Sequence, residues 1–355
     1  MTASSLLRIV EVDPHDVAAF DAWHAVYLAA ETHGLAGLAS PWQLEELRVA
    51  AQSNGQRGWS ASYSGHLADD PTGPPVCVGW VRTPLQDNLD RAEIGVHTHP
   101  DHRRRGHGRA MLAHVERIAR ERGRTVLYAE ATWPEAGGAA GEGQPGPEFA
   151  RATGFHLALG DVKRELRLPV DPAVLDELAA EAAPHHTAYT LRSWVGPVPE
   201  ELLESWARLN ASLMTEAPTG DLHVEPESAD PALVREAEET AARQGRTKLN
   251  TVALDAAGEV VAYTDLATTV HEPDRAYQWG TLVRRADRGH RLGLAVKVAN
   301  LRLLQEIRPG VERLITYNAE VNAPMVAVNE RLGFRPVARL GEFQRRLGPA
   351  GADVG

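Results

Sequence analysis

The sequence predicts an α/β protein in which helices cover mixed sheets and one domain is present twice. Its 355 residues are enough for two domains at ~100–200 residues each. The second half repeats the order of strands and helices predicted for the first, and both halves place an Arg/Gly-rich turn before a helix. We therefore expect tandem domains over residues 1–170 and 188–355, joined by a linker helix over residues 171–187.

The predicted elements of the first half follow the order β-α-α-β-β-β-α-β, judged from the spacing of apolar residues. Strands are predicted over residues 6–12, 59–64, 75–83, 91–98 and 125–131, and helices over 16–30, 42–51 and 108–122. The glycine-rich stretch 135–147 is expected to form a long loop. A short helix over 147–153 and a strand over 162–168 are then expected to close the first domain.

The second half repeats this order at an offset of 185 residues, which places Gly108 on Gly293. The same offset places Gly95 on Gly280. Strands are predicted over 189–195, 248–254, 259–268, 276–283 and 313–318, and helices over 200–214, 231–244 and 293–306. A repeat of this size indicates that a whole domain recurs.

Charge and composition exclude several classes of protein. The chain has 37 Lys and Arg against 48 Asp and Glu, a net charge of −11, which argues against non-specific nucleic-acid binding and is compatible with a cationic small substrate. The single cysteine, Cys77, forbids an internal disulfide and a zinc site of several thiolates, and no histidine pair has metal-binding spacing, so no metal is expected. Without a membrane-spanning run or a visible secretory signal, we expect a soluble cytoplasmic protein, monomeric or homodimeric, that binds no membrane.

The stretch from Pro100 to Ala110 gathers arginines and glycines between a predicted strand and an amphipathic helix. Gly106 and Gly108 let a ligand approach the backbone closely, and the exposed amides of a helix N-terminus favour a pyrophosphate. An arginine run by itself is usually a solvated surface. The strand–turn–helix context and its recurrence in the second half favour an anion-binding site instead.

The run Arg103-Arg104-Arg105-Gly106-His107-Gly108 resembles the signature of the GCN5-related N-acetyltransferase (GNAT) family, which is Arg or Gln, two residues, Gly, one residue, then Gly or Ala. The resemblance covers nearly the whole chain as two tandem GNAT acyltransferase domains. It implies that the first copy binds acetyl-CoA through Thr98, the signature residues and Arg109. In the second copy Arg291 stands where the family has a glycine, and the implied cofactor residues are Val283, Arg288, Gly289, His290, Arg291, Leu292 and Gly293.

A later motif of the family is similar to the run from Asn322 to Phe334. The resemblance implies that Asn322 contacts the cofactor arm. A tyrosine seven residues farther on often protonates the departing thiolate in the family, but Asn329 holds that position. The first copy has Gly143 and Ala150 at these two places, so it lacks both the Asn and the Tyr.

Acetyl transfer to an amine requires a neutral amine, donors for the oxyanion and a proton for the thiolate. The resemblance implies that backbone near Thr98 or Val283 supplies the oxyanion donor. Glu93 is a candidate general base because relatives often place one at this strand position, and a structural pairing with Arg91 is the alternative. Its counterpart Gln278 cannot act as a base, so the second copy would need another group, such as Asp265, Glu216 or His271.

Tyr128 and Tyr317 lie on the two predicted fifth strands, near the expected end of the cofactor arm, and are catalytic candidates, although a strand tyrosine more often serves packing. The sequence thus predicts an acetyl-CoA-dependent N-acetyltransferase in which a small, cationic amine attacks the thioester directly. Two alternatives stay open: a cofactor-binding sensor or scaffold without catalysis, and an acetyltransferase of protein lysines or N-termini. The acceptor and the catalytic copy are not predicted.

Overall fold

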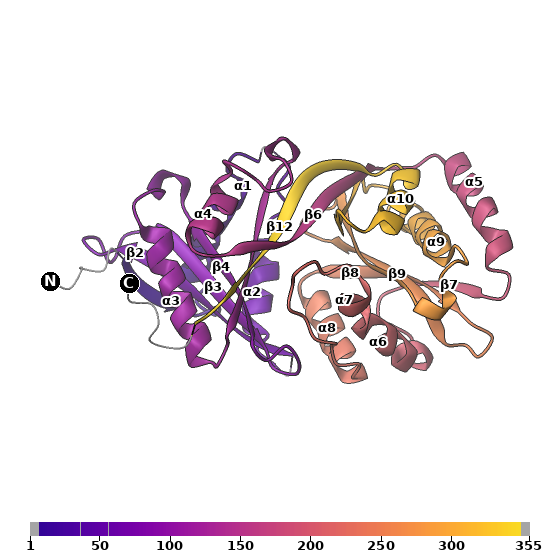
Figure 1. Cartoon of the computed structure of the whole chain (residues 1–355), viewed down its shortest axis with the longest axis horizontal. Helices are drawn as coiled ribbons and strands as arrows, with labels where there is room; N and C mark the ends of the chain where they lie inside the picture. The colour runs from indigo at the N-terminus through magenta and orange to yellow at the C-terminus, as the bar shows by residue number, and fades with distance from the viewer. Residues whose placement is uncertain (1–6, 36, 56, 349–355) are drawn as a thin grey trace. The chain divides into compact units, whose positions relative to one another are not determined.

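The computed structural model describes residues 7–35, 37–55 and 57–348 (Figure 1). Residues 1–6, on which the expected absence of a secretory signal rests, lie outside these ranges. The chain divides into two compact units, one of residues 1–160 with 339–355 and one of residues 161–338. Helices and strands are mixed in both units, which confirms the predicted α/β class and the tandem arrangement.

The first unit is built on a mixed sheet in which β1 to β4 run antiparallel and β5 runs parallel to β4. The strands are Leu7–Val12 (β1), Gly58–Leu67 (β2), Cys77–Pro84 (β3), Arg91–Thr98 (β4) and Val126–Pro134 (β5). Side chains of β4 alternate between the two faces of the sheet. Ile94 and Val96 pack in the core that contains Met111, whereas His97 lies on the other face against Tyr27.

Helices cover both faces of this sheet. They are Val17–Thr32 (α1), Leu44–Gln52 (α2), His107–Glu121 (α3) and Pro145–Ala152 (α4). Phe20 of α1 packs with Val78 on one face. On the other face, Met111, Val115 and Ala119 of α3 are fully buried, and Met111 and Val115 belong to the apolar stripe that predicts this helix.

The second unit repeats this arrangement with β7 to β10 antiparallel and β11 parallel to β10. Its strands are Thr190–Val195 (β7), Arg246–Leu254 (β8), Val260–Thr269 (β9), Arg275–Val283 (β10) and Arg313–Ala319 (β11). Its helices include Leu203–Ala211 (α6), Leu213–Glu216 (α7), Pro231–Arg243 (α8), Leu292–Ile307 (α9) and Ala323–Leu332 (α10). Figure 1 shows α9 and α10 on one side of the sheet and α6 to α8 on the other.

The closing strands follow a path that the sequence does not predict. Residues 162–168 are expected to close the first domain, but residues 161–167 of β6 (His156–Arg167) pair antiparallel with β11 in the second unit. Strand β12 (Arg335–Arg346) takes the reciprocal path and, from residue 339 onward, belongs to the first unit beside β5. Phe343 is 1% exposed there, in the same core as Trp133. The units exchange closing strands, so the division of the fold departs from the expected boundary at residue 170.

The predicted linker helix over residues 171–187 is shorter than expected and belongs to the second unit. It spans Pro172–Ala182 (α5), and the side chain of its N-cap, Asp171, accepts a hydrogen bond from the Ala173 amide. Leu175 and Leu178 are buried in a core shared with α9, so α5 is a packed element of the fold. In the part of the chain that the structure describes, no helix is both long and apolar enough to cross a membrane.

Candidate functional site

In each unit two parallel strands separate at the place predicted for the cofactor. Strands β4 and β5 pair only where Arg91–Glu93 meets Val126–Tyr128, and β10 and β11 pair only where Arg275–Tyr277 meets Arg313–Ile315. Beyond these pairs each sheet has a split that leads to the N-terminus of α3 or α9. Strand β10 also has a bulge between Gln278 and Thr281, whereas the register of β4 against β3 is regular. The carboxyl ends of such strands are a common place for a ligand in α/β sheets.

The side chain of Arg103 fixes the turn before α3 through hydrogen bonds to the backbone. Its guanidinium donates to the carbonyl oxygen of Thr98 at 3.4 Å and to that of Ala30 at 3.2 Å. Burial lowers the pKa of this guanidinium, and the nearby charge of Glu31 opposes that change. The side chain predicted to contact the cofactor therefore ties the end of β4 to the end of α1.

The turn before α9 keeps this anchor. Arg288 donates to the carbonyl oxygen of Val283 at 3.3 Å, as Arg103 does to Thr98. It also donates to the carboxylate of Glu216 at 2.8 Å. The first arginine of each signature therefore has the same structural function in both units.

Two backbone positions in each turn are left-handed. In the first unit they are Arg104, with φ 63°, and Gly106, with φ 87°. In the second unit they are Gly289, with φ 90°, and Arg291, with φ 53°. A side chain at such a position costs ~1–2 kcal/mol. The two turns therefore have the same conformation, with one glycine and one arginine at the left-handed positions. The arginine comes first in the first unit and second in the second unit.

The helix after each turn begins without a side-chain cap. Gly106 is the N-cap of α3 and Arg291 is the N-cap of α9, and within the described residues neither provides a capping side-chain hydrogen bond. The first amides of a helix lack acceptors inside the helix and carry the positive end of its dipole. Arg104, Arg105 and Arg109 are exposed around the start of α3. These groups fit the pyrophosphate of acetyl-CoA.

The two helix starts differ in their surroundings. A Cβ atom added to Gly108 would lie 3.3 Å from the Phe149 ring and from the Thr98 hydroxyl, so α3, α4 and the end of β4 meet closely there. Arg109 also donates to the carbonyl oxygen of Ala152 at 3.1 Å. At Gly293 the nearest atom belongs to Val283 at 3.7 Å, an ordinary contact.

A carboxylate stands at the turn of the second unit. Glu181 of α5 forms an ion pair with Arg291, the N-cap of α9. It also accepts a hydrogen bond from Arg331 of α10 at 3.0 Å. The arginine that replaces the glycine of the family signature is therefore already paired with an anion of the protein itself.

Two catalytic candidates of the first unit lie together in an ion-paired cluster. Glu93 accepts a hydrogen bond from Arg91 at 2.9 Å, and its second oxygen lies 3.7 Å from Arg82. Tyr128 stands opposite Glu93 on β5 and is 4% exposed, with the Arg91 guanidinium 4.1 Å from its ring centroid. Guanidinium groups engage both oxygens of the candidate base.

The candidates at the end of the second unit have structural partners. Tyr317 is half-buried on β11 opposite Lys163. Asn322 is the N-cap of α10, and its side-chain oxygen accepts from the Met325 amide at 3.4 Å. Asn329 is fully buried and donates to Asn318 at 2.5 Å. The side chains of Asn322 and Asn329 thus hold α10 in place.

Three predicted cofactor residues differ in exposure. His107 is the first residue of α3 and is 4% exposed, and burial lowers the pKa of its imidazole. Leu292 holds the same place in α9 and lies in an apolar core. Both can offer a ligand their backbone amides. His290 is exposed, and its ring lies beside that of Tyr189.

The alternative bases of the second unit are also engaged. Asp265 is 3% exposed, lies 2.6 Å from the Lys248 ammonium and accepts from the Gly280 amide at 2.9 Å. Glu216 pairs with Arg288, and the His271 Nε2 atom lies 3.2 Å from a backbone carbonyl oxygen. The amide of Gly280, inside the bulge of β10, is thereby satisfied within the protein.

Sequence reasoning missed a histidine–carboxylate pair in the first unit. The Nδ1 atom of His97 on β4 lies 3.2 Å from the carboxylate of Glu31 at the end of α1. The two residues are far apart in the sequence and share no motif. The available signal was the strand alternation, which places His97 on the same face as Glu93.

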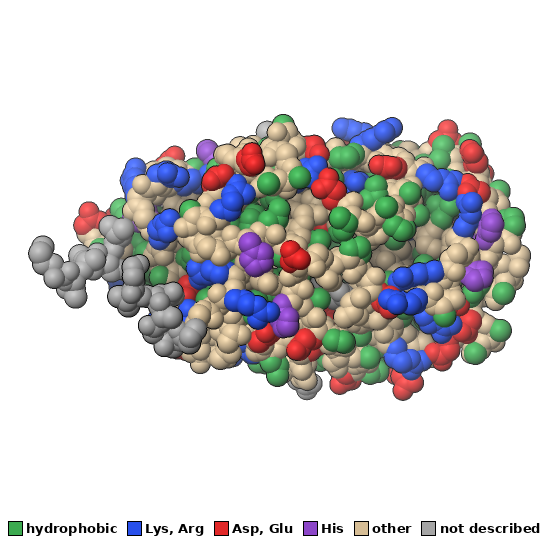
Figure 2. Space-filling model, viewed as in Figure 1, with side chains coloured by type: hydrophobic (Ala, Val, Ile, Leu, Met, Phe, Trp, Pro, Cys, Tyr) green, Lys and Arg blue, Asp and Glu red, His purple; other side chains and the backbone are tan. Residues whose placement is uncertain are grey.

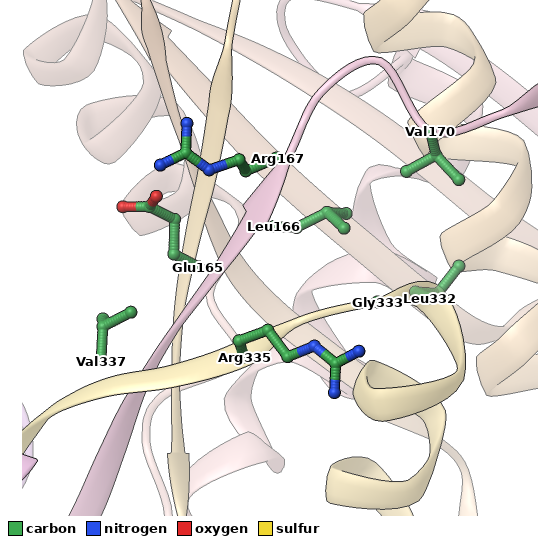
Figure 3. A pocket seen from close by; sticks show the side chains of 8 residues that line it. All are labelled: Glu165, Leu166, Arg167, Val170, Leu332, Gly333, Arg335 and Val337. Carbon is green, nitrogen blue, oxygen red and sulfur yellow. The ribbon is translucent and has the colours of Figure 1, made fainter.

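A pocket of about 480 Å³ opens in the second unit between β6, α10 and the start of β12 (Figure 3). Leu166 and Val170 are among its apolar lining residues. The guanidinium groups of Arg167 and Arg335 point in different directions in Figure 3, so they do not converge on one anion. Among the residues that the structure describes, no cluster of His, Cys, Asp and Glu is suited to hold a metal ion.

Comparison with known proteins agrees with this arrangement. Residues 21–136, within the first unit, match the family described as "Acetyltransferase (GNAT) family". The fold is similar to that of a "Tandem GNAT protein from the clavulanic acid biosynthesis pathway", with a TM-score of 0.74 and 27% identity over 97% of this chain and 99% of the other. A GCN5-related N-acetyltransferase from Sphaerobacter thermophilus, 15% identical over 99% of both chains with a TM-score of 0.64, shares the fold. No curated protein sequence matches the chain.

The split sheets, the Arg/Gly turns and these similarities define an acyl-CoA-dependent N-acetyltransferase. The chain carries the GNAT acetyltransferase fold twice in tandem.

Proposed function

We propose that the first unit transfers the acetyl group of acetyl-CoA to the primary amine of a small cationic molecule. The observation that carries this proposal is the uncapped N-terminus of α3, which follows an arginine-rich turn at the end of the β4–β5 split. Acetyl-CoA supplies an activated acetyl thioester as a substrate of the reaction. The first amides of α3, with Arg104 and Arg105, would hold its pyrophosphate.

The surroundings of Tyr27 support a cationic acceptor. Burial and then the charge of Glu31 raise the pKa of the Tyr27 hydroxyl, and the carboxylates of Glu130 and Glu46 act in the same direction. Trp42, which is 44% exposed, donates its backbone amide to the Tyr27 hydroxyl at 3.1 Å. Carboxylates beside aromatic rings favour an ammonium group. Acidic and basic side chains are interspersed on the face shown in Figure 2, so we assign the preference to this local cluster.

We infer that the second unit does not catalyse acetyl transfer. Glu181 pairs with Arg291 where the phosphates would bind. The carboxylate of Asp265 accepts the hydrogen bond of the Gly280 amide in the bulge of β10. Leu282, which corresponds to His97, is 7% exposed in an apolar cluster. These features favour a supporting function for this unit. The alternative of a domain without catalysis, which the sequence left open for the whole chain, is thus retained for its second half.

The proposal is tested by calorimetry and by release of free CoA. Acetyl-CoA should bind the full chain, and Arg104→Glu should weaken binding by at least tenfold, because it reverses an exposed charge beside α3. Arg285→Glu, at an exposed position of the second turn, is the matched control and should leave binding unchanged. Among amines, those with a second cationic group should release CoA fastest. Binding without release of CoA across the panel would reject catalysis and favour a sensor.

A further inference from the structure

His97 stands at a distinctive place in the first unit. It lies on β4 beyond Glu93, the last residue of that strand paired with β5, and one residue before Thr98, which anchors the turn. Its side chain shares the α1-facing side of the sheet with Glu93, while Ile94 and Val96 face the core beneath α3. His97 therefore lies beside the split and on the face that carries the carboxylates around Tyr27.

The contacts of the imidazole leave one nitrogen without a partner. Nδ1 lies 3.2 Å from the carboxylate of Glu31, and the ring meets that of Tyr27 edge-on with centroids 5.0 Å apart. Nε2 is buried and has no hydrogen-bond partner among the described residues, although 15% of the side chain is exposed. A buried polar atom without a partner calls for a ligand, a water or a catalytic function to explain it.

We propose that His97 is the general base of the first unit and that Glu31 positions its ring. An ionised carboxylate can only accept hydrogen bonds, so Glu31 selects the tautomer with the proton on Nδ1. Nε2 then presents its lone pair. This inference rests on the proposed acetyl transfer, because it assigns the group that makes the acceptor amine neutral.

The step balances without a further reactant. Nε2 of His97 takes a proton from the ammonium group of the acceptor, and the freed nitrogen lone pair attacks the carbonyl carbon of the acetyl thioester. A C–N bond forms, the C–S bond breaks, and the sulfur leaves with the bonding pair and takes a proton to become the CoA thiol. The new amide loses its remaining extra proton, so each turnover releases one proton overall.

The duplicated sequence offers an internal comparison for this assignment. The position of His97 is held by Leu282 in the second unit, where the side chain packs near Trp206 and Tyr263. Packing alone is therefore satisfied by an apolar residue at this place in the fold. Glu93, the other candidate base on this face, has both oxygens engaged by Arg91 and Arg82.

Several charged groups face the pair and will shape its pH dependence. Glu31 and the Tyr27 hydroxyl approach from α1. The Arg103 guanidinium of the turn lies close enough to Glu31 for their charges to interact. Glu130 of β5 and Glu46 of α2 act on Tyr27. The acidic limb of the rate profile is assigned to His97 only if it disappears when the imidazole is replaced and persists in a control variant.

The experiment compares His97→Gln and Glu31→Gln with the unchanged chain, using the best amine of the panel. His97→Gln should lower kcat by roughly 10²–10⁴-fold, keep the Kd for acetyl-CoA within about twofold and abolish the acidic limb of the pH profile. Glu31→Gln should lower kcat by a smaller factor and keep the Kd for acetyl-CoA within about twofold, because the imidazole stays on β4 but loses the carboxylate that orients it. His66→Gln, on β2 and two strands away from His97, has its ring against the carbonyl oxygen of Gly73; it is the control and should change neither.

Retention of kcat and of the acidic limb by a folded His97→Gln variant would overturn the assignment while leaving the proposed function intact. Equal losses in acetyl-CoA affinity and in kcat would also overturn it, because they indicate a structural function. Circular dichroism and thermal unfolding establish that the variant is folded. If the unchanged chain binds acetyl-CoA but acetylates no amine, the proposed function fails, and the assignment of a base fails with it.

Discussion

Replacement of Phe343 by Ala should destabilise the first unit, although this residue lies near the end of the sequence. Its side chain is 1% exposed, and its ring centroid lies 6.5 Å from that of Trp133. Truncation of a buried Phe costs about 3–5 kcal/mol, a large part of the ~5–15 kcal/mol that holds a domain folded. Leu166→Ala is the reciprocal change, because Leu166 is 3% exposed in the core of the second unit, and should cost about 2–5 kcal/mol there.

Hydrogen exchange measured by mass spectrometry on the full chain separates the two effects. Phe343→Ala should increase exchange in α3 and β5 and leave α9 and β10 unchanged, whereas Leu166→Ala should do the reverse. Arg346→Ala, at an exposed position of β12, is the control and should alter neither unit. If each variant loosened instead the unit that adjoins it in sequence, the exchange of closing strands would be refuted.

Three further predictions concern single positions. Gly108→Ala should cost ~1–3 kcal/mol because the new Cβ meets atoms at 3.3 Å, while Gly293→Ala, at 3.7 Å, should be neutral or stabilise by up to about 1 kcal/mol; urea unfolding distinguishes them. Glu181→Gln should release Arg291 and allow a second acetyl-CoA to bind, and an unchanged stoichiometry in calorimetry would contradict this. Burial lowers the pKa of Lys297 from 10.5 to about 7, so the unfolded chain binds more protons between these values and stability rises with pH across them. Lys297→Met should reduce this rise in urea unfolding followed against pH, and the part that remains is expected from Lys163, whose pKa burial lowers to about 8.

The elements of the fold that the sequence predicts are those whose apolar residues recur at a helical or strand spacing. Met111 and Val115 lie four residues apart and face one core, so the period of α3 is visible in the sequence. The exchange of β6 and β12 has no such signal. Both segments have the composition of a half-buried strand, and which sheet each joins depends on distant contacts such as Phe343 with Trp133.

The backbone conformation of the two turns was predictable from the sequence. The signature identified both turns because their conformation requires left-handed positions and a glycine close to the helix start. The directions of side chains were not visible. Arg103 turns inward because carbonyl groups at the ends of β4 and α1 lie within its reach, and Glu93 is engaged by two arginines of the sheet. The contact of His97 with Glu31 exists only because α1 packs across β4.

Three positions of the second unit differ from their equivalents at the place of the chemistry proposed for the first unit. In the second unit an apolar Leu282 replaces His97, Asp265 takes the amide of Gly280, and Glu181 pairs with the arginine of the turn. All three differences lie at the β10–β11 split or at the start of α9. The turn conformation and the packing of α9 on its sheet are kept. The core of α9 differs as well, because Lys297 and Asn300 are buried at the places that Leu112 and Val115 hold in α3. The three differences at the split, and not an unchanged core, are therefore what favours the first unit as the one that acetylates.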